Sequence, residues 1–498
     1  MTTFDPAVFA VFIALIGLVI LASALASGPI ERAGLPSVAL FLGLGALLGP
    51  HALGVIDFTL DSPTLGVIAT LSLVMVLFTD AVSLELAGLK GHWRLAAIIL
   101  GPGTLLSAAI VALAAWLLLD IPAAGAAILG AALASTDPVM MRGLLRLPGL
   151  PRVARYTLGI ESGLNDAVLL PIVLIAMVFL GTGGSPGAGA IGEVAGTVFL
   201  LGPLVGGLAG FLAVRFLDIV RPRYGMRRDY ESLYVIGIAF TAFAVAEALH
   251  GSGFMAAFTA GLVVAAMNVE LCDCFRDYGE ASAEMLLLLS FVAFGASLIW
   301  TGLEVLSWQA VVFALIALLV RTVVLQLFLP YREVEAGTRR LIVWFGPRAL
   351  SSLLLVLLPV FAGVPGSERL FPIAALVVLF SVLIHGAGLA VLTRQLREAR
   401  PEPRPAVSPW AGGPKPAPAG DLRGAELVAD RERITFEELA ALQQAGAPVR
   451  LLDVRREPDF MRLDRKARGA VRMHPDRAVR SAAAEALPKH DWLVAYCA

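Results

Sequence analysis

The stretch Gly159-Ile160-Glu161-Ser162-Gly163-Leu164-Asn165-Asp166 begins an apolar run that continues to Phe179. A run of this length is typical of a membrane-spanning helix, where carboxylates usually serve a function. In a helix, Ser162 and Asp166 lie four residues apart and share one face. Glu161 and Asn165 share the adjacent face in the same way. A hydroxyl beside a carboxylate is a pair of hard oxygen ligands suited to a small cation or a proton. The alternative is a buried polar patch that only holds helices together.

The composition predicts an all-α polytopic membrane protein. The chain has 498 residues, of which 58% are hydrophobic and 15% charged, and its mean hydropathy is +0.83. These values are typical of a chain with many membrane spans and exclude an ordinary soluble globular protein. We expect about thirteen spans, at residues 8–26, 35–53, 64–84, 94–119, 123–141, 157–180, 191–217, 231–249, 253–268, 282–299, 308–329, 341–362 and 370–393.

The distribution of charge between the loops predicts the orientation. With thirteen spans, the basic loop residues fall on one side of the membrane, and only Arg369 falls on the other. Because positively charged loops stay in the cytoplasm, we expect the amino terminus outside and the carboxyl-terminal tail in the cytoplasm, in a bacterial inner (plasma) membrane.

Two of the predicted spans contain a helix break. Pro138 disfavours helical geometry at Asp137, which can then cap a new half-helix, while the carbonyl of Thr136 becomes available to a cation. Gly346-Pro347 predicts a second break in the span at 341–362. An ordinary proline kink is the alternative for the first break. The two breaks lie seven spans apart, which favours two inverted six-helix repeats with discontinuous helices 5 and 12 and the site at their interface.

An arginine lies beside the second break. A buried guanidinium cannot lose its proton and therefore needs a carboxylate, so we expect Arg348 to pair with Glu161. Pairing with Glu284, or extension of the side chain to the membrane surface, is the alternative. Asp80 either lines the approach of the cation or meets the lipid headgroups.

The remaining isolated polar residues of the spans have simpler interpretations. Arg321 and Glu247 lie near span ends, where extension to the membrane surface is expected. His250 and His385 are single histidines in apolar surroundings, which favours packing over pH sensing.

These motifs resemble the monovalent cation:proton antiporter-1 family, the NhaP-type sodium/proton exchangers. The resemblance rests on Ser135-Thr136-Asp137-Pro138-Val139, Glu161 to Asp166, Gly251-Ser252-Gly253-Phe254-Met255-Ala256 with Ala260-Gly261-Leu262, and Gly346-Pro347-Arg348. It implies that Asp166 binds the cation or proton, with Ser162 and Thr136 as ligands. It also implies that Asn165 braces the crossing of the broken helices, that Glu161 and Arg348 form a structural pair, and that the protein is a homodimer. The family usually has Arg-Gly where this chain has Gly346-Pro347-Arg348.

One carboxylate that holds either a cation or a proton couples their movements by competition. Occupancy neutralises the acid in both cases, so exchange should be one for one and electroneutral. Asn165 in place of a second acid supports that stoichiometry. We expect a secondary antiporter rather than an enzyme. It should exchange Na⁺ for H⁺, with Li⁺ or K⁺ as further candidates, by alternating access, with no cofactor and no nucleic-acid partner, in contact with membrane lipid.

The carboxyl-terminal tail has a different composition from the rest of the chain. We expect an exchanger domain at 1–396, a proline-rich linker at 397–431 and a partial rhodanese-like domain at 432–498. The last resemblance rests on Leu452-Asp453-Val454-Arg455, Arg468-Gly469-Ala470-Val471 and Val494-Ala495-Tyr496-Cys497. Cys497 would correspond to the sulfur carrier, but the sequence given ends one residue later, so we expect an inert or partner-completed domain. The alternative function is a membrane-anchored sulfurtransferase or redox sensor that uses Cys497.

Overall fold

The computed structural model describes residues 13–25, 37–84, 93–145, 150–224, 228–267, 269–329 and 334–399, and in the tail 436–444, 448–454, 467, 469–473 and 492–496. Contacts divide the chain into two compact units, Met1–Glu402 and Pro403–Ala498.

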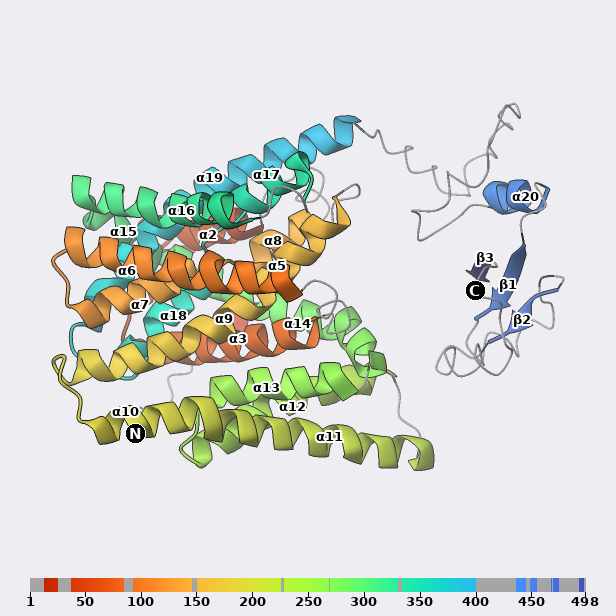
Figure 1. Ribbon diagram of the computed structural model, residues 1–498, viewed down its shortest axis with the longest axis horizontal. Coiled ribbons are helices and arrows are strands. Elements are labelled where there is room, and N and C mark those ends of the chain that lie inside the picture. Colours follow the sequence, from red (N-terminus) through yellow and green to blue (C-terminus); the bar gives the residue numbers. More distant parts are fainter. Residues whose placement is uncertain are drawn as a thin grey trace. The chain divides into compact units, whose positions relative to one another are not determined.

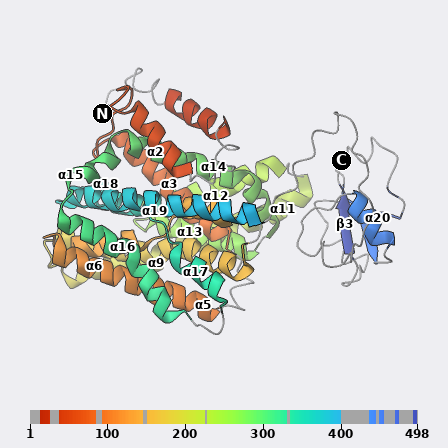
Figure 2. The same cartoon turned by 90° about the horizontal axis from the view of Figure 1, so that it is seen from above.

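The first unit is helical, and its helices lie side by side (Figures 1 and 2). In Figure 1, α16, α17 and α19 lie along one edge and α11 along the opposite edge. After a first helix at Ile13–Leu25, the elements in order are α2 (Ser37–Leu48), α3 (Pro63–Val82), α5 (Trp93–Ile98), η1 (Ile99–Leu106), α6 (Ser107–Leu118), α7 (Ala123–Ala134), α8 (Pro138–Leu145), α9 (Arg152–Gly181), α10 (Ala188–Gly196), η2 (Thr197–Leu201), α11 (Gly202–Tyr224), α12 (Arg228–Ala248), α13 (Gly253–Met267), α14 (Val269–Ala296), η3 (Leu298–Trp300), α15 (Thr301–Glu304), α16 (Trp308–Phe328), α17 (Ala336–Trp344), α18 (Leu350–Phe361), η4 (Ser367–Arg369) and α19 (Leu370–Ala399).

The predicted polytopic α-helical fold is confirmed. Among the described residues, eight helices are long and apolar enough to cross a membrane, or nine if the bent pair Ala281–Ala296 and Leu298–Glu304 counts as one span. Four shorter apolar helices accompany them, at Ile13–Leu25, Ser37–Leu48, Gly253–Met267 and Leu350–Phe361. Helical structure therefore lies in each of the thirteen predicted runs, whereas the number of complete spans and the inverted repeat stay predictions.

Both predicted helix breaks are present. The first separates α7 from α8 at residues 135–137, and the second separates α17 from α18 at residues 345–349. Pro138 is the first residue of α8, where its missing N–H costs no hydrogen bond. We call these two interrupted segments together the crossover, because hydrogen bonds described below join them.

Helices α2 and α14 are in backbone contact. A Cβ atom added at Gly45 would lie 2.3 Å from the carbonyl oxygen of Val292, and one added at Gly295 would lie 2.3 Å from that of Leu42. Glycine is therefore required at both positions for the two helices to approach this closely. The adjacent core includes Phe294 of α14, whose ring centroid lies 6.0 Å from that of Phe371 in α19.

The second unit contains α20 (Phe436–Gln444), β1 (Val449–Asp453), β2 (Val471–Arg472) and β3 (Trp492–Tyr496). The strands form a parallel sheet in the order β2-β1-β3. Asp453 is fully buried at the end of β1, where Arg472 Nη1 lies 3.9 Å from its Oδ1. Each of the three segments on which the rhodanese-like resemblance rests overlaps one of these strands. The rhodanese-like character stays a prediction, and Cys497 lies outside the described residues.

Replacement of Gly45 by alanine should destabilise the protein by about 1 to 3 kcal/mol, because the new methyl group would overlap the α14 backbone. The measurement is thermal unfolding of the purified protein in detergent. Gly43→Ala is the matched control on the same helix, since an added Cβ there meets nothing within 4 Å. Equal unfolding temperatures for the two variants would contradict the close contact.

Candidate functional site

Asp166 lies on α9 and is almost completely buried, with 1% of its surface exposed. The hydroxyl of Ser135, in the first break, donates a hydrogen bond to Asp166 Oδ1. Among the described residues, Oδ2 has no hydrogen-bond partner. Arg348 and Ser351 also lie near this carboxylate. A carboxylate oxygen without a hydrogen-bond partner can accept a cation or a proton, and Asp166 presents such an oxygen at the crossover.

Asn165 ties α9 to the first break. Its Nδ2 donates to Thr136 Oγ1 at 2.7 Å and to the Thr136 carbonyl at 3.3 Å. This contact fits the bracing role expected for Asn165. Both Thr136 oxygens keep a second lone pair, so the contact leaves them able to bind a cation.

Asp137 caps two half-helices at once. Its Oδ1 accepts from Met140 N of α8 at 2.9 Å, and its Oδ2 accepts from Leu350 N of α18 at 2.8 Å. Its own backbone N–H donates to the carbonyl of Pro347 at 2.9 Å. The capping role predicted for Asp137 at α8 is present, and the structure adds the second half-helix. A carboxylate at two helix amino termini interacts favourably with both dipoles.

Arg348 donates hydrogen bonds at a carboxyl-terminal helix end, whereas Asp137 accepts them at amino-terminal ends. Its Nη1 donates to the carbonyls of Ala134 and Ser135 at 2.7 and 2.8 Å, at the carboxyl-terminal end of α7. The side chain is fully buried. A guanidinium here supplies donors to carbonyls that the break leaves without helical partners.

The predicted pairing of Glu161 with Arg348 is wrong. Glu161 pairs with Arg321 of α16, whose Nε and Nη2 each lie 2.5 Å from one carboxylate oxygen. Arg321 Nη1 and Nη2 also donate to the carbonyls of Val343 and Ile342 at the end of α17, both at 3.0 Å. Arg348 is instead directed to α7, and the hydrogen bonds described for its side chain go to Ala134 and Ser135 rather than to the alternative partner Glu284.

The expected extension of Arg321 to the membrane surface is also wrong, since only 2% of the residue is exposed. Arg321 lies seven residues before the end of α16 at Phe328, a depth of about 10 Å at the helical rise. That depth is the sequence signal for an internal partner, because a charged side chain so far from the helix end cannot easily reach the membrane surface.

Ser162 and Asp80, the other two predicted cation ligands, make no described hydrogen bond to Asp166. Ser162 is buried, but its hydroxyl donates to the carbonyl of Gly159 in its own helix at 3.3 Å. Asp80 is 8% exposed in the last turn of α3, so its side chain is not at an exposed surface. A Cβ added at Gly163 of α9 would lie 3.5 Å from the Asp80 carbonyl oxygen, which places Asp80 beside the helix of Asp166. The hydroxyl that contacts Asp166 is that of Ser135, which the sequence reasoning did not select.

The charges at the crossover are nearly balanced. Asp137 and Glu161 carry two negative charges, and Arg348 and Arg321 carry two positive charges. Asp137 accepts two backbone N–H groups, and Glu161 accepts two guanidinium bonds. Asp166 is the additional acid of this group, and the hydrogen bond described for it comes from a neutral hydroxyl. Burial of an unbalanced carboxylate is costly, so a proton or a cation stabilises it.

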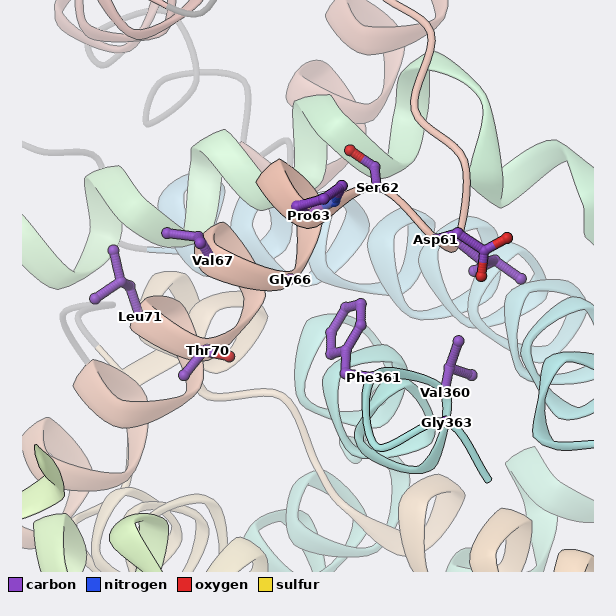
Figure 3. Close-up of a pocket in the computed structure, with 11 residues that line it drawn as sticks. Asp61, Ser62, Pro63, Gly66, Val67, Thr70, Leu71, Val360, Phe361 and Gly363 are labelled. Carbon is purple, nitrogen blue, oxygen red and sulfur yellow. The ribbon is translucent and has the colours of Figure 1, made fainter. Parts of the chain in front are cut away.

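A separate cavity of about 540 Å³ lies between α3 and the end of α18. Asp61, Ser62 and Thr70 are its polar lining residues, and Figure 3 shows the Phe361 ring beside Gly66. Val360 lies ten residues beyond Leu350, a distance of about 15 Å along the helix. Asp166 is not among the residues that line this cavity.

Comparison of the sequence with known proteins matches a family model and individual relatives. Residues 11–395 match the family model described as "Sodium/hydrogen exchanger, transmembrane". The K(+)/H(+) antiporter NhaP of Alkalimonas amylolytica is 27% identical over 393 residues, which cover 77% of this chain and 67% of the relative. The Na(+)/H(+) antiporter NhaH of Halobacillus dabanensis is 28% identical over 322 residues, covering 59% of this chain and 74% of the relative.

The fold has a solved counterpart. The structure of the sodium proton antiporter MjNhaP1 from Methanocaldococcus jannaschii at pH 8 superposes with a TM-score of 0.61 and 20% identity. The match covers 78% of this chain and 99% of that chain.

Removal of one partner of the Glu161–Arg321 pair should destabilise the protein by about 3 to 5 kcal/mol, because the other charge stays buried. A double-mutant cycle of Glu161→Gln and Arg321→Gln, followed by thermal unfolding in detergent, measures the coupling. The same cycle with Arg348→Gln is the control, and we expect a smaller coupling there. A larger coupling of Glu161 to Arg348 would restore the pairing expected from the sequence.

Proposed function

Since the chain belongs to the sodium/hydrogen exchanger family and is a secondary cation/proton antiporter rather than an enzyme, we propose that a monovalent cation and a proton compete for Asp166. The observation that carries the proposal is the contrast among the three buried acids of the crossover. Asp137 and Glu161 are held by backbone N–H groups and by a guanidinium, whereas Asp166 accepts from Ser135 and its Oδ2 has no hydrogen-bond partner among the described residues.

The groups around Asp166 suit a small cation. The Ser135 hydroxyl is already in contact, the Thr136 oxygens lie in the same break, and Ser162 lies one helical turn away on α9. Asp80 would line the approach. Hydroxyl and carbonyl oxygens are ligands that alkali cations accept, and broken membrane helices commonly supply them. Each cation bound would replace one proton, so the loaded site carries the same charge in both directions of transport.

The identity of the cation and the assembly belong to the same proposal. Relatives are named as antiporters of K⁺ and of Na⁺, so both ions are candidates here, with Li⁺ as a third. The protein is a multi-pass membrane protein. We further propose that it forms a homodimer in the bacterial plasma membrane, with its amino terminus outside and its tail in the cytoplasm. The sulfurtransferase alternative has no support, because Cys497 lies outside the described residues and the family match covers residues 11–395.

Asp166→Asn should reduce exchange to the background of protein-free liposomes, because an amide can neither release a proton nor balance a cation. The measurement is dequenching of a pH-sensitive dye in proteoliposomes on addition of Na⁺, K⁺ or Li⁺. Asp120→Asn is the matched control. Asp120 is exposed and has a left-handed backbone (φ 49°), which asparagine also adopts. Retained exchange in Asp166→Asn would remove Asp166 from its proposed role.

Exchange by the unmodified protein should be insensitive to membrane potential, because one positive charge moves each way. In proteoliposomes, potentials imposed in both directions by gradients of the permeant anion thiocyanate should leave the rate of Na⁺-driven proton movement unchanged. A rate that follows the potential would indicate unequal stoichiometry and would contradict the one-for-one competition. Vesicles with the Asp166→Asn variant give the background.

A further inference from the structure

His385 lies in α19 and is buried, with 5% of its surface exposed. It takes no part in the proposed transport site. Its Nδ1 lies 3.3 Å from both the hydroxyl and the carbonyl oxygen of Ser381, one turn earlier in the same helix. A buried imidazole with a specific polar partner has a role that apolar packing alone does not explain.

Ser381 connects His385 to the crossover. The backbone N–H of Arg348 donates to Ser381 Oγ at 2.6 Å. A serine hydroxyl that accepts one bond still has a proton to donate. The Nδ1 of a neutral His385 is an acceptor within reach of that proton, so the three groups form a chain from Arg348 N through Ser381 Oγ to His385 Nδ1.

The imidazole also contacts the other side of the second break. Trp344 is the last residue of α17, and its ring centroid lies 6.1 Å from that of His385. A Cβ added at Gly388 would lie 3.3 Å from Trp344 Nε1, so this tryptophan packs closely on α19. Helix α19 therefore contacts the chain immediately before and within residues 345–349.

Two guanidinium groups face His385, that of Arg348 at the break and that of Arg321 on α16, and the backbone carbonyls of Ser381 and Trp344 also interact with the ring. A protonated imidazole would add a third cation to these two and would offer no acceptor to Ser381. The hydrogen-bond chain through Ser381 uses the neutral tautomer whose Nδ1 carries no proton.

We propose that neutral His385 is a positioning residue which, through Ser381, fixes the Arg348 backbone so that the guanidinium reaches the carbonyl end of α7. Its effect on transport rests on the proposed function, but its effect on the break does not. The helical hydrogen bonds of α17 and α18 extend into the break at Phe345 N and Ala349 O, whereas the Arg348 N–H donates to Ser381 of α19. Contacts from outside the segment therefore fix the position of the Arg348 backbone, from which the guanidinium extends.

Two substitutions separate this role from packing. His385→Leu keeps an apolar side chain and removes the acceptor, whereas His385→Asn places a carboxamide oxygen close to the position of Nδ1. Hydrogen–deuterium exchange of the purified protein in detergent reports the peptide that covers residues 345–349. We expect this peptide to exchange about tenfold faster in His385→Leu, because the Arg348 amide loses a firmly held partner, and to exchange at nearly the normal rate in His385→Asn.

Ser381→Ala provides a second route to the same test. It should reproduce the faster exchange, and adding His385→Leu to it should produce no further change. His250→Asn is the matched control, since His250 is exposed outside the crossover and has a left-handed backbone (φ 59°). Proton transport measured across pH should keep the same profile in His385→Asn, because asparagine keeps the acceptor and His385 takes no part in the proposed transport site.

Several results would overturn the proposal. Normal exchange at 345–349 in both His385→Leu and Ser381→Ala would remove the positioning role. Equal defects in His385→Asn and His385→Leu would assign the ring to packing on Trp344. A shifted pH profile in His385→Asn would assign it to titration. Absence of cation/proton exchange in the unmodified protein, with the expected exchange at 345–349, would instead contradict the proposed function and leave the positioning role supported.

Discussion

The structure depends on how the ends of two interrupted helices are satisfied inside apolar protein. Each break leaves carbonyls at one end and N–H groups at the other without helical partners, and water is scarce at that depth. Three charged side chains supply the partners. Asp137 accepts from the amino-terminal ends of α8 and α18, Arg348 donates to the end of α7, and Arg321 donates to the end of α17. Each charge has the sign that the helix dipole favours.

These contacts at the helix ends determine which acid of the crossover remains available to bind a cation or a proton. Glu161 neutralises Arg321, and Asp137 and Arg348 have opposite charges within the same crossover. Asp166 is then the carboxylate whose charge the helix ends do not require. The chemistry of exchange and the stability of the fold are therefore assigned to different acids, which allows Asp166 to change its occupant while the helix ends keep their partners.

The helix breaks and the Asp137 cap could be predicted from the sequence because their signals are local. Pro138 and Pro347 mark the breaks, and the Asp137 cap follows from the residue before Pro138, because proline restricts the backbone within one or two positions. The partner of Glu161 could not be predicted, because it lies on α16, 160 residues away, and packing sets the rotation of one helix against another. Ser135 was missed because helical periodicity does not apply to a residue inside a break. The site roles of Ser162 and Asp80 depend on the same interhelical geometry.

The contacts of Asp137 have a consequence for biogenesis. Leu350 is 213 residues later in the chain, and at typical rates of synthesis those residues take about 10 to 40 s to emerge. During that interval α7 and α8 are in the bilayer without α18, the second half-helix that Asp137 caps, and without the Arg348 guanidinium that donates to the Ala134 carbonyl. The first half of the protein is therefore an incomplete insertion intermediate, which needs water, lipid headgroups or the insertion machinery as temporary partners until translation reaches α18.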